Sequence, residues 1–144
     1  MKSLPTLLAS YAAYHRDPWN RLAHLVGIPI IALSTFGLLG IWATLAALTA
    51  LTVYYVRIDR VLGGSVSLAL WLGAATVFAL HWSWKVHAGF FVAGWVLQFM
   101  GHAIEGRRPA LVDNLAQVFS APLFLGAEVL FLFGWRPDLR RRLH

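Results

Sequence analysis

The stretch LVGIPIIALSTFGLLGIWATLAALTALTVYYV, residues 25–56, decides the fold of this 144-residue chain, because its 32 residues include no Lys, Arg, Asp, Glu or His. As one helix it would be about 48 Å long, well beyond a hydrocarbon core of about 30 Å. It is therefore predicted to form two short membrane spans, with Gly37 and Gly40 marking the turn between them.

Other charge-poor segments extend this pattern. Residues 57–60 close the first hairpin, and residues 61–80 and 88–105 are predicted to be the third and fourth spans. Residues 3–15 are predicted to form a short helix against the membrane or the bundle. We therefore expect an all-α, multi-pass transmembrane helical bundle, with residues 1–144 as a single domain.

The last apolar stretch, residues 115–135, is interrupted by Pro122 and carries Glu128. A fifth span, a re-entrant pair and an interfacial helix all agree with this pattern. If the chain has four spans, the basic tail lies on the same side of the membrane as the other basic loops only when residues 115–135 do not cross the membrane. This favours a re-entrant or interfacial helix.

The composition agrees with a membrane protein: 59% of the residues are hydrophobic and 12% are charged. Too little polar surface is available to cover a soluble domain of this kind. The apolar segments recur along the whole chain, unlike a cleaved signal peptide. No cysteine is present, so any metal site must use nitrogen and oxygen ligands.

The net charge of +6 does not indicate nucleic-acid binding, because the basic residues lie between the apolar runs and at the tail. This distribution is typical of cytoplasmic loops and contacts with anionic lipid. The frequent Ala, Leu and Arg favour a bacterial source. We expect a multi-pass protein of the bacterial cytoplasmic membrane, with membrane lipid as its partner.

Polar chemistry gathers just before the first span, in YHRDPWNRLAH, residues 14–24. Asp17 is predicted to be a helix N-cap, with Pro18 at the first helical position. The new helix then carries Asn20 and His24 one turn apart on a shared face.

A second polar group lies at the end of the fourth predicted span. Gln98, His102 and Glu105 are spaced by four and three residues, so their side chains project from one side of a helix. An even number of crossings returns this end to the membrane face that carries His15 and His24. Three histidines and a carboxylate suit Zn, Fe or Mn, with Glu105 as a ligand or as the residue that orients a ligand histidine. By spacing alone, histidines that cap helix ends remain an equal alternative.

Other polar residues are assigned structural roles. His81 and His87 lie near Trp82 and Trp84 on the opposite face, where interfacial anchoring is expected. Glu128 is expected to face the bundle and to pair with an arginine or a site histidine. Asp113 and Asn114 are candidate caps of the last helix, with Gln117 beside them, and a role in the site is an equal alternative. Tyr11 is interpreted as an interfacial aromatic residue.

The polar motifs together resemble the small membrane proteins related to the fungal 2-hydroxy fatty acid dioxygenase. The resemblance rests on two sets of residues: Tyr14-His15, Asn20, His24, Gly27 and Pro29, then Gln98-Phe99, Gly101-His102, Glu105, Pro109-Ala110-Leu111 and Asp113-Asn114. It implies an Fe(II)-dependent oxygenase that uses O2 to shorten a 2-hydroxy fatty acid by one carbon, without haem or a separate organic cofactor. It also implies that His15, His24 and His102 hold the iron, with Glu105 as fourth ligand or orienting residue.

On this interpretation Glu105 and Asn20 are the predicted catalytic side chains. The predicted substrate-binding residues share the membrane face of the histidines: Arg16, Arg21, Gln98, Arg107 and Arg108. Three other hypotheses remain open at this point. One is a zinc-dependent lipid hydrolase on the same ligands, another is a structural or lipid-handling bundle without a metal, and the third is a bis-histidine haem protein.

Overall fold

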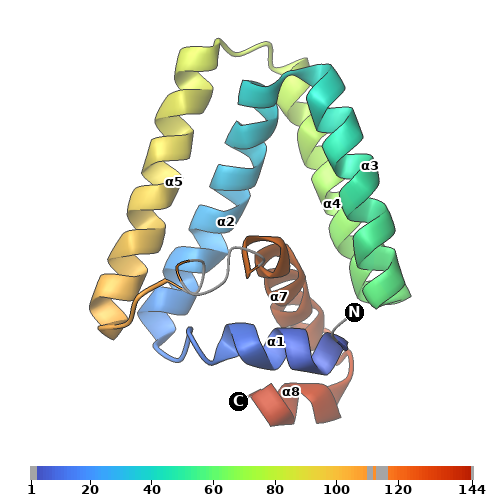
Figure 1. The fold of residues 1–144 in the computed structure, drawn as a ribbon, viewed down its shortest axis with the longest axis vertical. Coiled ribbons are helices and arrows are strands. Elements are labelled where there is room, and N and C mark those ends of the chain that lie inside the picture. The colour runs from blue at the N-terminus through green and yellow to red at the C-terminus, as the bar shows by residue number, and fades with distance from the viewer. Residues whose placement is uncertain (1–2, 110–111, 113–116, 144) are drawn as a thin grey trace.

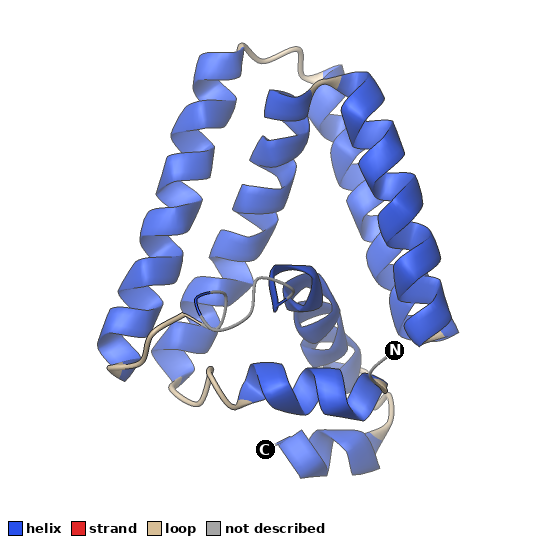
Figure 2. Cartoon of the chain, viewed as in Figure 1, coloured by secondary structure: helices blue, strands red, loops and turns tan. Residues whose placement is uncertain are grey.

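The computed structural model describes residues 3–109, 112 and 117–143, and these residues form helices and no strand (Figure 2). The all-α prediction is confirmed. The helices are α1 (Leu4–Ala12), α2 (Pro18–Leu39), α3 (Ile41–Ile58), α4 (Arg60–Ala79), α5 (Trp84–Glu105), α7 (Gln117–Leu132) and α8 (Pro137–Leu143).

Four long helices form two antiparallel pairs, α2 with α5 and α3 with α4 (Figure 1). The pairs converge at the end that carries the α2–α3 turn and the α4–α5 loop, and they spread apart at the other end (Figure 1). Helices α1 and α8 lie across the spread end, and α7 enters between the pairs there (Figure 1). The beginning of α2 and the end of α5 therefore lie at the same end of the bundle, as the sequence predicts.

Among the described residues, three helices, α2, α3 and α4, are long and apolar enough to cross a membrane. Helix α5 has 22 residues but falls outside this set. His87, Gln98 and His102 contribute to its lower hydropathy. It begins at Trp84, so the predicted interfacial loop at 81–87 is shorter than expected.

Local sequence signals place the helix ends. Asp17 Oδ1 accepts hydrogen bonds from the backbone N–H groups of Trp19 and Asn20, at 2.8 and 3.1 Å, and Pro18 is the first residue of α2. The predicted N-cap is confirmed. Gly40 separates α2 from α3 with a φ of +76°, a left-handed value that favours glycine. Gly37, predicted to share that turn, instead lies inside α2 against the ring of His87.

The main hydrophobic core sits at the spread end, where α7 packs on α1 and α4. The hydroxyl of Tyr55 donates to the carbonyl of Phe119 at 2.9 Å, and Arg136 pairs with Asp59 at 2.7 Å. The 16 residues of α7 are about 24 Å long, shorter than the hydrocarbon core. One helix packed at one end of the bundle agrees with the interfacial alternative. Asp113 and Asn114, predicted to cap it, lie outside the described residues.

Candidate metal centre

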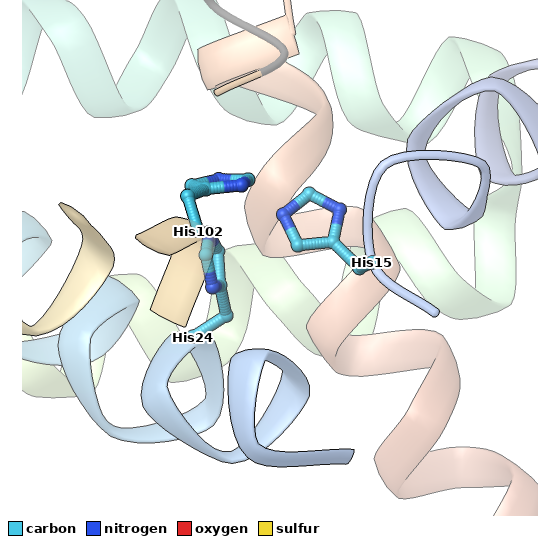
Figure 3. A group of neighbouring side chains, drawn as sticks. All are labelled: His15, His24 and His102. Atoms are coloured by element: carbon cyan, nitrogen blue, oxygen red, sulfur yellow. The ribbon is translucent and has the colours of Figure 1, made fainter. Parts of the chain in front are cut away.

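Three histidine rings converge at the spread end of the bundle (Figure 3). His15 comes from the segment between α1 and α2, His24 from α2 and His102 from α5. All three side chains are buried, and each offers one ring nitrogen such that the three nitrogens lie within 4.8 Å of one another. The predicted meeting of the two polar motifs is therefore present in the structure.

Hydrogen bonds to backbone carbonyls orient two of the rings. Nδ1 of His15 lies 2.8 Å from the carbonyl oxygen of Tyr11, and Nδ1 of His24 lies 2.8 Å from that of Asn20. Because a carbonyl oxygen only accepts, each Nδ1 must carry the proton, which leaves Nε2 as a neutral nitrogen with a free lone pair. Such a bond is the usual support of a metal-binding histidine. Nε2 of His15 is buried and has no hydrogen-bond partner among the described residues.

Aromatic packing fixes the position of His15. Its ring stacks on that of Tyr11, with centroids 4.2 Å apart and planes 8° from parallel. The ring centroid of Phe124 in α7 lies 6.3 Å from that of His15. Burial lowers the pKa of His15 from its ordinary 6.5 to about 4, and His102 acts in the same direction, although the bond to the Tyr11 carbonyl opposes the shift. His15 is therefore neutral at pH 7, as metal binding requires.

The close approach of α5 to α2 depends on Gly101. A Cβ atom at this position would lie 2.5 Å from Asn20 Oδ1 and 3.0 Å from the Cβ of Ala23. Such distances are too short for ordinary packing. The absence of a side chain at Gly101 therefore lets the next residue, His102, reach the other two rings.

Asn20 and Glu105 connect the two helices beside the rings. The Asn20 amide nitrogen donates to Glu105 Oε2 at 2.6 Å and to the carbonyl of Tyr14 at 3.3 Å. Its distance to Nδ1 of His102 is 3.5 Å, the longest of the three. Glu105 Oε1 accepts from the backbone N–H of Arg16 at 2.9 Å. The Glu105 carboxylate thus contacts groups around the histidines, and the potential metal group among the described residues consists of histidines alone.

The arrangement fits a metal ion. Two nitrogens that bind one ion at about 2.1 Å in a tetrahedral site lie about 3.4 Å apart, so closing the outer limit of 4.8 Å requires each ring to shift by less than about 1 Å. The donor set of three neutral imidazoles suits Fe, Zn or Cu and leaves positions for further ligands. A metal here would be held by His15, His24 and His102.

The histidines line one end of a cavity of about 220 Å³. From His24 the cavity follows α2 as far as Phe36, a distance of about 18 Å along the helix. Beyond the histidines its lining is mostly apolar, with Ile28, Ile31, Ala32, Leu51, Leu70 and Phe36 among the residues that form it. The site therefore joins a polar centre to a long apolar channel.

Among the predicted substrate-binding residues, Gln98 lines this cavity, and the four arginines are not part of its lining. Arg21 pairs with Glu128 at 2.7 Å, which confirms the predicted arginine partner of Glu128. Arg107 donates to the carbonyl of Ala13 at 2.9 Å. Arg16 and Arg108 are exposed at the same end of the bundle.

Two residues of the site were not assigned to it from the sequence. Tyr11, interpreted as an interfacial aromatic, instead supports the ring of His15. Gln117, weighed equally as a helix cap, lines the cavity. A glutamine inside an apolar stretch was the available signal, because polar side chains at membrane depth usually serve a site.

Comparison with known proteins identifies relatives of the chain. Residues 1–58 and 61–133 match the family described as 2-hydroxy-palmitic acid dioxygenase Mpo1-like. The chain is 32% identical, over 97% of its length and 87% of the relative's, to the 2-hydroxy-palmitic acid dioxygenase MPO1 of Saccharomyces cerevisiae. No solved structure matches the chain. The matched length and the identity show that this chain belongs to the Mpo1-like family of 2-hydroxy-palmitic acid dioxygenases.

Proposed function

We propose that this protein is a membrane-embedded, Fe(II)-dependent dioxygenase that shortens 2-hydroxy fatty acids by one carbon. The observation that carries the proposal is the position of three buried histidines at one end of a long apolar cavity. Membership of the Mpo1-like family, and the activity in the name of the yeast relative, support the same conclusion.

The overall reaction needs no external reductant. A 2-hydroxy acid and O2 give the acid that is one carbon shorter, CO2 and water, and atoms and electrons balance. Fe(II) held by the three histidines would supply the chemistry that activates O2 and binds the substrate's oxygen atoms. This agrees with a site that requires neither haem nor an organic cofactor.

The protein side chains have distinct tasks in this proposal. The carbonyls of Tyr11 and Asn20 keep the protons of His15 and His24 on Nδ1, so that Nε2 is available to the metal. Glu105 acts through Asn20, which it holds beside His102, and is thus proposed to be an orienting residue. The apolar channel along α2 excludes water and accepts the acyl chain.

The distribution of basic residues supports a proposal for the position of the site in the membrane. The exposed arginines of the α1–α2 and α5–α7 segments and of α8 lie at the end of the bundle that holds the histidines, and Lys85 lies at the other end. Because basic loops of membrane proteins face the cytoplasm, this distribution supports a metal centre at the cytoplasmic face of the membrane. A fatty acid would enter with its headgroup at the interface and its chain between the helices.

Metal analysis of protein purified without O2 and without chelator tests the proposal. We expect close to one iron per chain in the wild type and a loss of most of it in His102→Ala. His87→Ala is the matched control, because His87 is a buried histidine of the same helix that lies outside the cluster. This variant should keep its iron.

Each outcome of the experiment distinguishes between hypotheses. Iron that depends on His102, together with O2 uptake on addition of 2-hydroxypalmitic acid, supports the dioxygenase. Zinc in place of iron would support a lipid hydrolase on the same ligands. Protein that retains no metal after reconstitution with Fe(II) would overturn the proposal in favour of a structural bundle.

A further inference from the structure

We infer that Gln98 and Gln117 form the recognition site for the headgroup of the substrate, and that Gln117 binds the 2-hydroxyl group. This inference rests on the proposed function and extends it from the metal to the choice of substrate. The Gln98 amide is assigned to the carboxylate and the Gln117 carbonyl to the hydroxyl.

Gln98 presents an unused donor beside the metal centre. It lies one turn before His102 on the same face of α5, and its side chain is buried in the wall of the cavity. Its Nε2 packs against the backbone of Gly27, where no Cβ intervenes, and has no hydrogen-bond partner among the described residues. A buried amide without a partner costs free energy that a ligand oxygen would recover.

Gln117, the first residue of α7, presents the complementary group from another element of the cavity lining. Its Nε2 donates to the hydroxyl of Ser10 in α1 at 3.3 Å, which sets the direction of the amide. Its Oε1 is then the free atom, and it is buried without a partner among the described residues. The two glutamines therefore offer one donor and one acceptor at the histidine end of the cavity.

A 2-hydroxy acid matches this pair of atoms. Its carboxylate only accepts hydrogen bonds and can be bound by the N–H of Gln98, whereas its hydroxyl is the group that donates and can be bound by Oε1 of Gln117. An unsubstituted fatty acid has no donor for Gln117 and would leave that oxygen unpaired. A site built around a substrate hydroxyl rejects the analogue that lacks it for this reason.

Binding measured without turnover tests the inference. Protein loaded with Fe(II) is kept free of O2 in detergent, and 2-hydroxypalmitic acid and palmitic acid each displace a fluorescent fatty acid. For Gln117→Leu we expect the affinity for the hydroxy acid to fall by about 10- to 100-fold, with a change of less than about threefold for palmitic acid. For Gln98→Leu we expect both affinities to fall together by about tenfold, with the preference between them kept.

A control variant separates recognition from folding. Thr35→Val removes a cavity hydroxyl that already donates to the carbonyl of Ile31, and it should keep the preference for the hydroxy acid. Ser10→Ala removes the bond that orients the Gln117 amide and should weaken the preference. Iron content and thermal unfolding are compared in all variants, so that a general loss of structure is recognised.

The result also distinguishes this inference from the proposed function. A wild type that binds no iron, or that shows no preference for the hydroxy acid, would contradict the proposed function itself. A wild type that prefers the hydroxy acid, together with a folded Gln117→Leu variant that keeps the full preference, would overturn the role of Gln117 alone. Loss of the preference in Gln98→Leu would overturn the division of roles.

Discussion

The side-chain amide of Asn20 donates a hydrogen bond of 2.6 Å to the carboxylate of Glu105, and so links the first turn of α2 to the last residue of α5. Asn20 is fully buried, and the side chain of Glu105 is only 6% exposed. Because both residues adjoin the histidines, this bond ties the metal centre to the packing of the two helices.

Asn20→Leu should lower the free energy of unfolding by about 1–3 kcal/mol, because it leaves a buried carboxylate without one of its donors. The measurement is unfolding of the detergent-solubilised protein by SDS, followed by circular dichroism. Glu105→Gln provides the comparison, since it removes the charge and keeps an acceptor, and it should cost less. Equal stability of Asn20→Leu and the wild type would contradict the structural role of this bond.

Gly101→Ala should separate α2 from α5, because its Cβ would collide with Asn20 and Ala23. We expect at least about a tenfold loss of metal affinity, since displacement of His102 acts directly on the ligand set. The affinity is measured by competition with a metal chelator.

Gly89→Ala is the matched control for that experiment. It lies on the same helix, and a Cβ there meets no atom within 4 Å. Because alanine favours helices, this variant should gain up to about 1 kcal/mol in stability and retain its metal. If both variants lost metal equally, the close approach at Gly101 would not be the cause.

The pair formed by Arg21 and Glu128 joins α2 to α7, with side chains 30% and 24% exposed. Such partly solvated pairs contribute about 1 kcal/mol, and a double-mutant cycle with Arg21→Met and Glu128→Gln should give a coupling near that value. The cycle also tests the prediction that Arg21 binds substrate. In that case Arg21→Met would raise KM, while Glu128→Gln would leave KM unchanged.

Acid should destabilise the metal-free protein through His15. The pKa of His15 is about 4 in the folded state and 6.5 in the unfolded state. Above pH 6.5 the residue is neutral in both states, and its contribution to the free energy of unfolding is fully present. As the pH falls from 6.5 to 4 the unfolded state takes up a proton that the folded state does not, and about 3 kcal/mol is lost. Unfolding of wild type and His15→Gln is compared between pH 7.5 and about 4.5. Parallel pH profiles would count against this assignment.

Ala32→Phe should shorten the apolar channel. Ala32 lines the cavity about 12 Å along α2 from His24, so a ring there would block long acyl chains but leave room for short ones. We expect kcat/KM to fall more for 2-hydroxypalmitic acid than for 2-hydroxyoctanoic acid. Ala43→Phe, on the exposed side of α3, should leave this ratio unchanged.

Local chemistry explains which features the sequence could predict. Asp17, Pro18 and Gly40 act through their own backbone or their nearest neighbours, so the N-cap, the helix start and the turn follow from residue type alone. The convergence of the histidines was also predictable, because the number of spans determines on which face His24 and His102 emerge.

Features that depend on long-range packing were not predictable in the same way. Gly37 has the residue type of a turn, but it serves as the contact point for His87, and a sequence pattern does not distinguish these two uses of glycine. The insertion of α7 between the helix pairs likewise depends on side chains from several elements. The roles of Tyr11 and Gln117 follow from that insertion, so they emerged only with the structure.

The order in which the histidines are synthesised has a consequence for maturation. His15 and His24 enter the membrane with the first long helix, whereas His102 follows three helices later. A nascent chain therefore lacks one ligand until α5 has been translated and inserted. The full set of three histidines would therefore meet a metal ion only in the completed bundle, where the ion would fasten the earliest long helix to the latest long one.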